Sequence, residues 1–236
     1  MIDHSKLVLE KIVLELRFPS GFLFFDNCGK VCKKIVQYYP NIEFQKINVD
    51  GTQFTLNEKF LGCSISHTNL AIAQEFPLKL DDFEELSETV SSILIKEFEI
   101  ESFARIGNRF FYTYPSENRS KSQELIKETS IINFDSDKFK IFGDEVTGVN
   151  VTLNFKDKDI GTNLIINDFS ERRLQSATHP LIKSIEPTKF YKGGIQIDLD
   201  RYTLKPLSSG QLSCRELIKN NKKESERSIE LLFKSK

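Results

Sequence analysis

The chain of 236 residues contains no tryptophan, one methionine, seven prolines and only four cysteines. Four cysteines are few for a chain of this length, so they predict reduced thiols and a cytoplasmic location rather than a disulfide framework. No apolar run reaches the roughly 18 residues that a membrane-spanning helix needs, so no membrane partner is predicted. The first residues lead directly into strand-like sequence and show no signal-peptide cleavage pattern.

Neither sign of charge dominates, because 33 Lys and Arg are matched by 34 Asp and Glu, for a formal net charge of −1. A protein whose whole surface binds nucleic acid is usually strongly basic. Any nucleic-acid role must therefore depend on a local patch.

Signatures of catalysis and cofactor binding are also missing. The sequence has no Gly-x-Ser-x-Gly turn, no P-loop and no dinucleotide fingerprint. Gly193-Gly194 precedes a strand-like run and not a helix, so it lacks the helix N-terminus that would hold a phosphate; it predicts a turn or bulge. We therefore predict no cofactor, and the sequence favours a non-enzyme.

What the chain does have is a pattern of elements that occurs twice. Apolar residues at period two predict strands, and apolar residues at helical spacing predict helices. The first series is a strand, a helix, an antiparallel meander and a helix, at residues 7–17, 22–39, 42–76 and 82–96. The second series is a strand, a short helix, four strands and a long helix, at residues 103–112, 120–126, 139–142, 146–155, 162–166, 194–204 and 215–233.

This order predicts an α+β protein of two tandem similar halves, residues 1–100 and 101–236, each a mainly antiparallel sheet with helices packed on one face. A similar order occurs in the duplicated fold of TATA-binding proteins and in helix-grip proteins. Capping-box spacing predicts the helix starts at Ser120 and Ser213, and Asp81 is the expected cap of the helix before residue 100. Residues 168–191 fit no period and predict a long irregular insertion, a type of segment that is often functional.

Three segments resemble a sporadically distributed family of uncharacterised bacterial proteins of similar length. They are the opening strand at residues 12–19 (Ile-Val-Leu-Glu-Leu-Arg-Phe-Pro), residues 104–110 (Ala-Arg-Ile-Gly-Asn-Arg-Phe), and residues 197–200 (Ile-Asp-Leu-Asp) with the terminal helix. The central Arg-Ile-Gly-x-Arg pattern lies in the second of these. The resemblance implies no known activity. The family's patchy occurrence implies an accessory role, such as antiviral defence or a function in mobile-element islands.

Two arginines are the main candidate binding residues. Arg105 and Arg109 lie on one face of a predicted strand about 13 Å apart, and Gly107 between them leaves room for a partner. Such guanidinium groups can grip separate acidic groups. The alternative is that they pair within the chain, with Asp198, Asp200 or Glu15. With the basic pair of the predicted insertion, the binding residues are Arg105, Arg109, Arg172 and Arg173.

Asp198 and Asp200 are the alternative site, because carboxylates about 7 Å apart on a strand can hold a divalent metal, as in nucleases. The chain has no Asp/Glu-x-Lys triplet, so the commonest restriction-type nuclease core lacks its third element. A zinc site from Cys28, Cys32, Cys63 and His67 is disfavoured, since the last two stand about 13 Å apart on a strand. No metal site is therefore predicted apart from this alternative.

We expect a non-catalytic cytoplasmic interaction protein that binds a protein partner or a second copy of itself. One alternative is a metal-dependent nuclease or phosphoesterase using Asp198 and Asp200. Another is a nucleic-acid-binding protein, with bases at Lys219, Lys222, Lys223 and Arg227 and stacking surfaces at Phe110, Phe111, Tyr112 and Tyr114.

Overall fold

The computed structural model describes residues 6–19, 21–48, 50–77, 79–129, 131, 147–174 and 189–233. Within these residues the main strands are β1 (Val8–Arg17), β2 (Glu43–Asn48), β3 (Gly51–Leu56), β4 (Leu61–Ile65), β5 (Asn69–Glu75), β7 (Arg105–Ser116), β8 (Asn150–Asp157), β9 (Ile160–Leu174) and β10 (Lys189–Thr203). The α-helices are α1 (Leu23–Tyr38), α2 (Asp81–Glu97), α3 (Arg119–Glu128) and α5 (Cys214–Leu232). The short strands β6 (Ser102–Phe103) and β11 (Leu207–Ser208) pair with each other.

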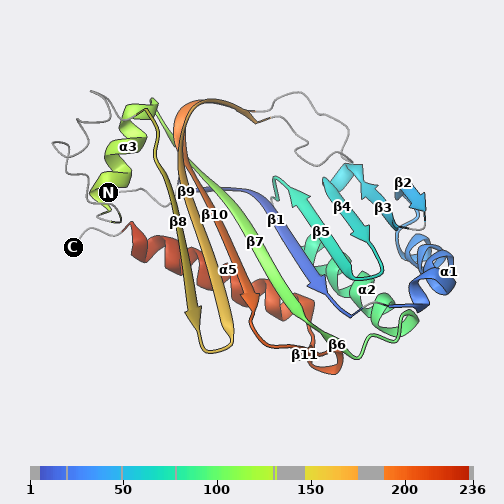
Figure 1. Cartoon of the computed structure of the whole chain (residues 1–236). Helices are drawn as coiled ribbons and strands as arrows, with labels where there is room; N and C mark the ends of the chain where they lie inside the picture. Colours follow the sequence, from blue (N-terminus) through green and yellow to red (C-terminus); the bar gives the residue numbers. More distant parts are fainter. Residues whose placement is uncertain are drawn as a thin grey trace.

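The described strands form one nine-stranded antiparallel sheet in the order β2-β3-β4-β5-β1-β7-β10-β9-β8 (Figure 1). Strands β1 and β7, which open the two halves, pair with each other in the middle of this sheet. On either side the later strands of each half follow in reverse order, and each half ends in a long helix, α2 or α5. The predicted α+β fold of two similar halves is thus confirmed. The division of the chain into two domains at residue 100 stays a prediction. In the structure, one sheet and one hydrophobic core run through both halves.

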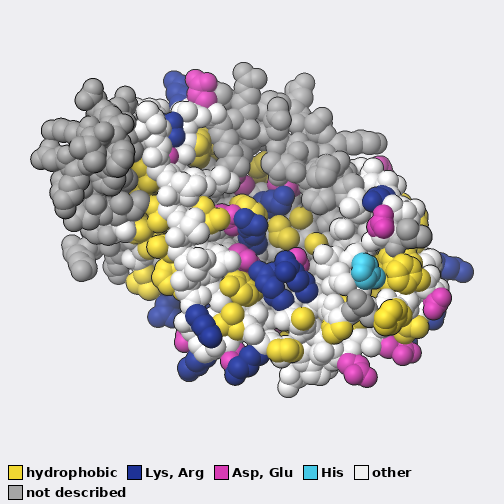
Figure 2. Space-filling view, viewed as in Figure 1, with side chains coloured by type: hydrophobic (Ala, Val, Ile, Leu, Met, Phe, Trp, Pro, Cys, Tyr) yellow, Lys and Arg dark blue, Asp and Glu magenta, His cyan; other side chains and the backbone are white. Residues whose placement is uncertain are grey.

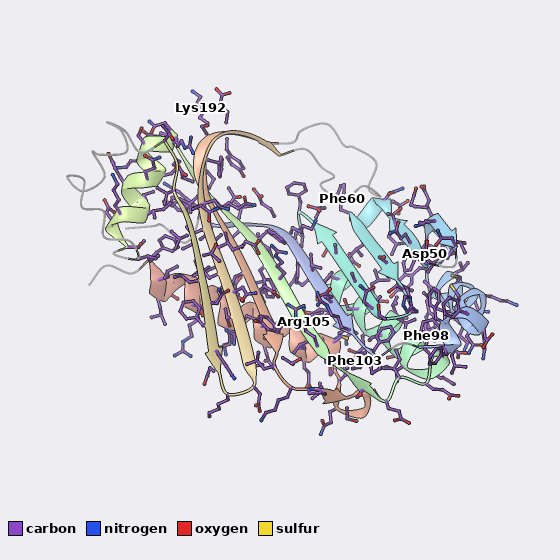
Figure 3. All side chains as sticks on the ribbon, in the orientation of Figure 1. Asp50, Phe60, Phe98, Phe103, Arg105 and Lys192 are labelled. Carbon is purple, nitrogen blue, oxygen red and sulfur yellow. The ribbon has the colours of Figure 1, made fainter. Side chains whose placement is uncertain are left out.

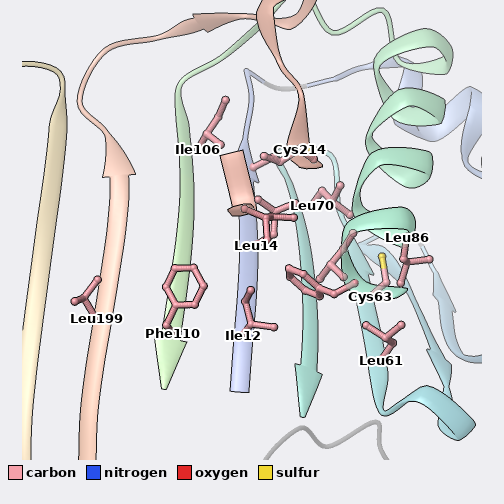
Figure 4. Packing of buried hydrophobic residues seen from close by; sticks show 14 of the residues in the cluster. Ile12, Leu14, Leu61, Cys63, Leu70, Leu86, Ile106, Phe110, Leu199 and Cys214 are labelled. Carbon is pink, nitrogen blue, oxygen red and sulfur yellow. The ribbon is translucent and has the colours of Figure 1, made fainter. Parts of the chain in front are cut away.

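The core lies between the sheet and helices α2 and α5. Alternation along β1 turns Ile12 and Leu14 toward the helices, where both are fully buried. Phe110 pairs with Ile12 on one side and with Leu199 on the other, so these side chains form a continuous row across three strands (Figure 4). Leu86 of α2 packs against the same cluster. Burial of this row stabilises the junction between the two halves.

The predicted irregular insertion is wrong for residues 168–174 and 189–191. These residues extend β9 and β10 in regular register, with Lys189 opposite Leu174 and Tyr191 opposite Arg172. Charged and apolar residues are mixed in this extension without a single period, and it forms by backbone pairing between the two strands. The rest of the predicted insertion, and the strand predicted at 139–142, lie outside the described residues.

Gly193 and Gly194 also differ from the prediction, since they pair regularly within β10 and form neither a turn nor a bulge. A Cβ atom at Gly193 would lie 2.4 Å from the backbone carbon of Asn118, and one at Gly194 would lie 2.5 Å from the ring of Phe169. Close packing therefore explains these two glycines.

Helix caps were predicted correctly only for the last helix. The Ser213 side chain accepts a hydrogen bond from the backbone N–H of Glu216 at the start of α5. The cap of α3 lies two residues earlier than predicted, because Asn118 and not Ser120 accepts from the N–H of Lys121 at 2.9 Å. Leu80 precedes α2 without a side-chain cap, so the Asp81 cap was wrong.

One buried carboxylate joins α1 and α2 by ion pairs. Glu97 at the end of α2 pairs with Lys30 at 2.6 Å and with Lys34, and its side chain is 3% exposed. Hydrogen bonds from these two lysines lower the pKa of Glu97 from 4.5 to about 2. The ionised form is therefore favoured by folding.

Stability should consequently depend on pH through Glu97. A carboxylate whose pKa is lowered by folding stabilises the protein above its unfolded pKa and loses this contribution as the pH falls toward the folded value. We expect the stability difference between wild type and Glu97→Gln in urea unfolding to shrink between pH 5 and pH 2. A difference that stays constant over this range would contradict the assigned role.

Candidate functional site

The face of the sheet opposite α2 and α5 carries the predicted site (Figure 1). Since Ile12 and Leu14 turn toward the helices, Lys11, Glu15 and Arg17 of β1 turn the other way. Figure 2 shows Lys and Arg side chains, interspersed with Asp and Glu, gathered over the middle of this open face. They come from the three central strands β1, β7 and β10.

Arg105 joins all three of these strands (Figure 3). Its Nη1 donates to Glu15 on β1, and its Nη2 donates to Asp200 on β10 at 2.7 Å. The guanidinium carbon lies 4.4 Å from the centre of the Tyr202 ring. A Cβ atom at Gly107 would lie 3.2 Å from Tyr202 Cβ and 3.3 Å from Arg105 Nη1, so the glycine makes room for this intramolecular arrangement.

Arg109 forms a two-point pair with Asp198 on β10. Its Nε donates to one carboxylate oxygen at 2.7 Å and its Nη2 to the other. The guanidinium carbon lies 4.8 Å from the centre of the Phe111 ring, and Lys11 approaches the same ring at 5.9 Å. The hydrogen bonds to Asp198 raise the pKa of Arg109. Arg109 is nevertheless 46% exposed, so it can still contact another molecule.

Two further pairs complete this group, Lys11 with Glu75 at 2.8 Å and Arg17 with Glu15 at 3.0 Å. We call the whole set the ionic cluster: Lys11, Arg17, Arg105, Arg109, Glu15, Glu75, Asp198 and Asp200. Its charges cancel, and each carboxylate is bonded to a cation. The structure therefore has the intramolecular pairing that the sequence left as an alternative; binding by these arginines stays a prediction.

Burial opposes the ionisation of one member of the cluster, Asp200. Burial raises its pKa, and the nearby Glu15 adds to that effect, although Arg105 and Arg109 oppose it. Arg105 and Arg109 thus offset part of the cost of burying the Asp200 carboxylate in its charged form. That cost would become larger if either cation were removed.

For the second predicted arginine pair, Arg172 and Arg173, the structure describes the backbone and not the side chains. Arg172 and Arg173 lie in β9, opposite Tyr191 and Phe190 of β10. Their side chains lie outside the described residues, and their binding role stays a prediction.

The metal alternative places Asp198 and Asp200 on one face, as predicted, but each carboxylate accepts from an arginine. Among the described residues, no group of three or more His, Cys, Asp or Glu converges to hold a metal ion. Cys63 is fully buried, while His67 stacks on the Phe25 ring at 6.2 Å. This geometry gives the nuclease hypothesis no support.

The nucleic-acid alternative relied on aromatic residues that turn out to be buried. Phe110, Tyr112 and Tyr114 all belong to the hydrophobic core. Phe111 is the member of this run that lies partly exposed on the open face. On α5, Lys219 lies 3.4 Å from Glu84, and Lys222 pairs with Glu226 on its own helix at 2.6 Å.

Sequence reasoning missed an anchor between α3 and β9. The buried Asp168 carboxylate accepts hydrogen bonds from Arg119 at 2.6 Å, from Gln123 at 2.9 Å and from the N–H of Val149 at 2.7 Å. Burial alone would raise the pKa of Asp168, but these bonds prevail and lower it. The signal available was Arg119 and Gln123 at i and i+4 on one helix face. Nothing in the sequence named their partner, about 45 residues away.

Comparison with known proteins assigns no family. No family model matches the chain, and no curated protein sequence matches it. Among solved structures the chain is similar to Methanococcus jannaschii TBP, with a TM-score of 0.30 and 10% identity over 95% of this chain and 98% of that chain. A likeness at that level does not assign a function. No helix among the described residues is long and apolar enough to cross a membrane.

Proposed function

We propose that the chain is a non-catalytic interaction protein that binds a protein partner on the open face of its sheet, around the ionic cluster. The observation that carries this proposal is Arg109, which is fixed by Asp198, stacked on Phe111 and still half exposed. Arginine and aromatic side chains held in place dominate binding energy in many protein interfaces. A preorganised guanidinium also loses less side-chain entropy on binding.

The charge balance of the cluster favours protein over nucleic acid. Binding to phosphates needs an excess of cations, because counterion release drives it. Here every cation of the cluster has a carboxylate beside it, so the local field is close to neutral. A protein surface with charges of both signs fits such a face better.

We further propose a bacterial, cytoplasmic setting with an accessory role in defence or in a mobile-element system. The support for this setting is the resemblance of the three sequence segments and the low cysteine content. A second copy of the chain is the alternative partner.

Affinity purification of tagged protein from the native host tests the proposed surface. We expect the recovered partner to bind the Arg109→Ala/Phe111→Ala variant at least about 30-fold more weakly, which corresponds to a loss of about 2 kcal/mol or more. Lys46→Ala, an exposed change on edge strand β2, is the matched control and should retain the partner.

Equal recovery by both variants would contradict the proposal. The two alternatives have their own readouts. Tight Mn²⁺ binding in calorimetry, lost in Asp198→Ala, would favour the nuclease. A gel shift that weakens sharply with salt would favour nucleic-acid binding.

A further inference from the structure

A groove of about 1150 Å³ lies on the helix-covered side of the sheet, away from the ionic cluster. Its floor is apolar and consists of Leu7, which precedes β1, Leu9 near the start of β1, and Tyr112 of β7. Pro77 and Leu80, just before α2, form one wall. The opposite wall is the second half of α5, residues 222–230.

The groove exists because α2 starts too late to cover this part of the sheet. Helices α2 and α5 are antiparallel, because residue numbers rise along α5 as they fall along α2. The contacts that show this are Cys214 with Ser91 at 3.2 Å, Arg215 with Glu88 at 3.1 Å, and Lys219 with Glu84 at 3.4 Å. The next turns of α5 then pass the start of α2 at Asp81. Beyond that point α5 has no neighbouring helix along the floor among the described residues. An additional helix in line with α2 would complete the layer.

The rim of the groove carries charges of both signs in helical rows. On α5, Lys222, Glu226 and Glu230 lie at i, i+4 and i+8, and Lys223 and Arg227 form a second row. Lys223, Arg227 and Lys79 have no ion pair among the described residues. Charged rows beside an apolar strip are the arrangement that flanks a helix–helix seam.

The floor also contains a polar atom that lacks a partner. The Tyr112 hydroxyl is buried and has no hydrogen-bond partner among the described residues. An unsatisfied buried hydroxyl costs free energy, so a polar atom of a docked molecule that reaches it would be stabilising.

We infer that this groove binds an amphipathic helix of a protein partner, laid against α5 in line with α2. The helix would present apolar residues at i, i+3, i+4 and i+7 to Leu7, Leu9 and Leu80. Acidic residues on its flank would meet Lys223 and Arg227.

The site can be tested without knowing the natural partner. The probe is a phage-displayed library of helical peptides of about 18 residues, five turns, panned on the full chain. We expect enriched peptides with apolar residues at helical spacing, which become helical when bound. Lys223→Glu/Arg227→Glu should weaken their binding at least about tenfold, while the matched control Lys46→Glu/Lys156→Glu, exposed charges elsewhere, should not.

Three outcomes would overturn the inference. The first is enrichment of no helical pattern, or equal binding to the groove and control variants. The second is that no peptide is enriched, while dansylundecanoic acid binds saturably to the wild type and not to the groove variant. That result would assign the groove to a small amphiphile. The third is self-association in ultracentrifugation that only the groove variant removes, which would assign it to a second copy. All changes leave Arg109 and Phe111 intact, so the test is separate from that of the open face.

Discussion

Gly193→Ala is expected to destabilise the protein by about 3 kcal/mol, the upper end of the roughly 1–3 kcal/mol that overpacking usually costs. The added Cβ atom would lie 2.4 Å from the carbonyl carbon of Asn118 and 2.7 Å from the nitrogen of Arg119. Both are backbone atoms at the start of α3, so relief requires that the helix shift relative to β10. Such a shift would also strain the Arg119–Asp168 pair. Urea unfolding at neutral pH measures the effect.

Gly29→Ala is the matched control for this change. Gly29 is exposed on α1, and a Cβ atom there would meet nothing within 4 Å. Alanine in a helix is more favourable than glycine by roughly 0.5–1 kcal/mol, so this variant should be slightly more stable than wild type. Similar losses of stability in both variants would show that the close approach at Gly193 is wrong.

Arg105→Met is expected to cost about 2 kcal/mol at pH 7. This lies between the small effect of an exposed ion pair and the 3–5 kcal/mol for removing one partner of a buried pair. Arg105 is 21% exposed, and the change leaves Glu15 and Asp200 facing each other without their shared cation. Methionine preserves the packing of the chain against Tyr202, so the loss reports mainly the charge.

The cost of Arg105→Met should depend on pH in a defined direction. Burial already raises the folded-state pKa of Asp200, and Arg105 opposes that rise, so removing this cation should raise the pKa of Asp200 further above its unfolded value. A raised carboxylate pKa destabilises the fold at high pH, and protonation removes that penalty. The deficit relative to wild type should therefore be largest near pH 8 and shrink toward pH 4.

Two further variants make this prediction specific to the cluster. Arg17→Met removes a 55%-exposed cation that also contacts Glu15, and it should cost less than about 1 kcal/mol. Adding Asp200→Asn to Arg105→Met should restore part of the lost stability, because it removes the buried negative charge that Arg105 no longer offsets. If the loss of stability in Arg105→Met does not change with pH and is not relieved by Asp200→Asn, Arg105 acts by packing alone.

Local patterns in the chain were enough for most elements. The period-two alternation of β1 and the apolar spacing of α2 depend only on neighbours in sequence, and both elements formed where they were expected. The Ser213 cap at α5 is likewise local. The extension of β9 and β10 was harder to predict, because its apolar residues follow no single period and it forms by pairing between two separate segments of the chain.

The candidate site shows the same division. Alternation alone placed Arg105, Arg109, Asp198 and Asp200 on strand faces, and it left open whether their charges would meet. The sequence by itself determined the repeated elements and the side of each strand on which its charged residues lie. Only the tertiary structure decided the rest. Pairing of β1 with β7 and of β7 with β10 brought Glu15 and Asp200 to the two sides of Arg105, since strand register sets which distant residues become neighbours.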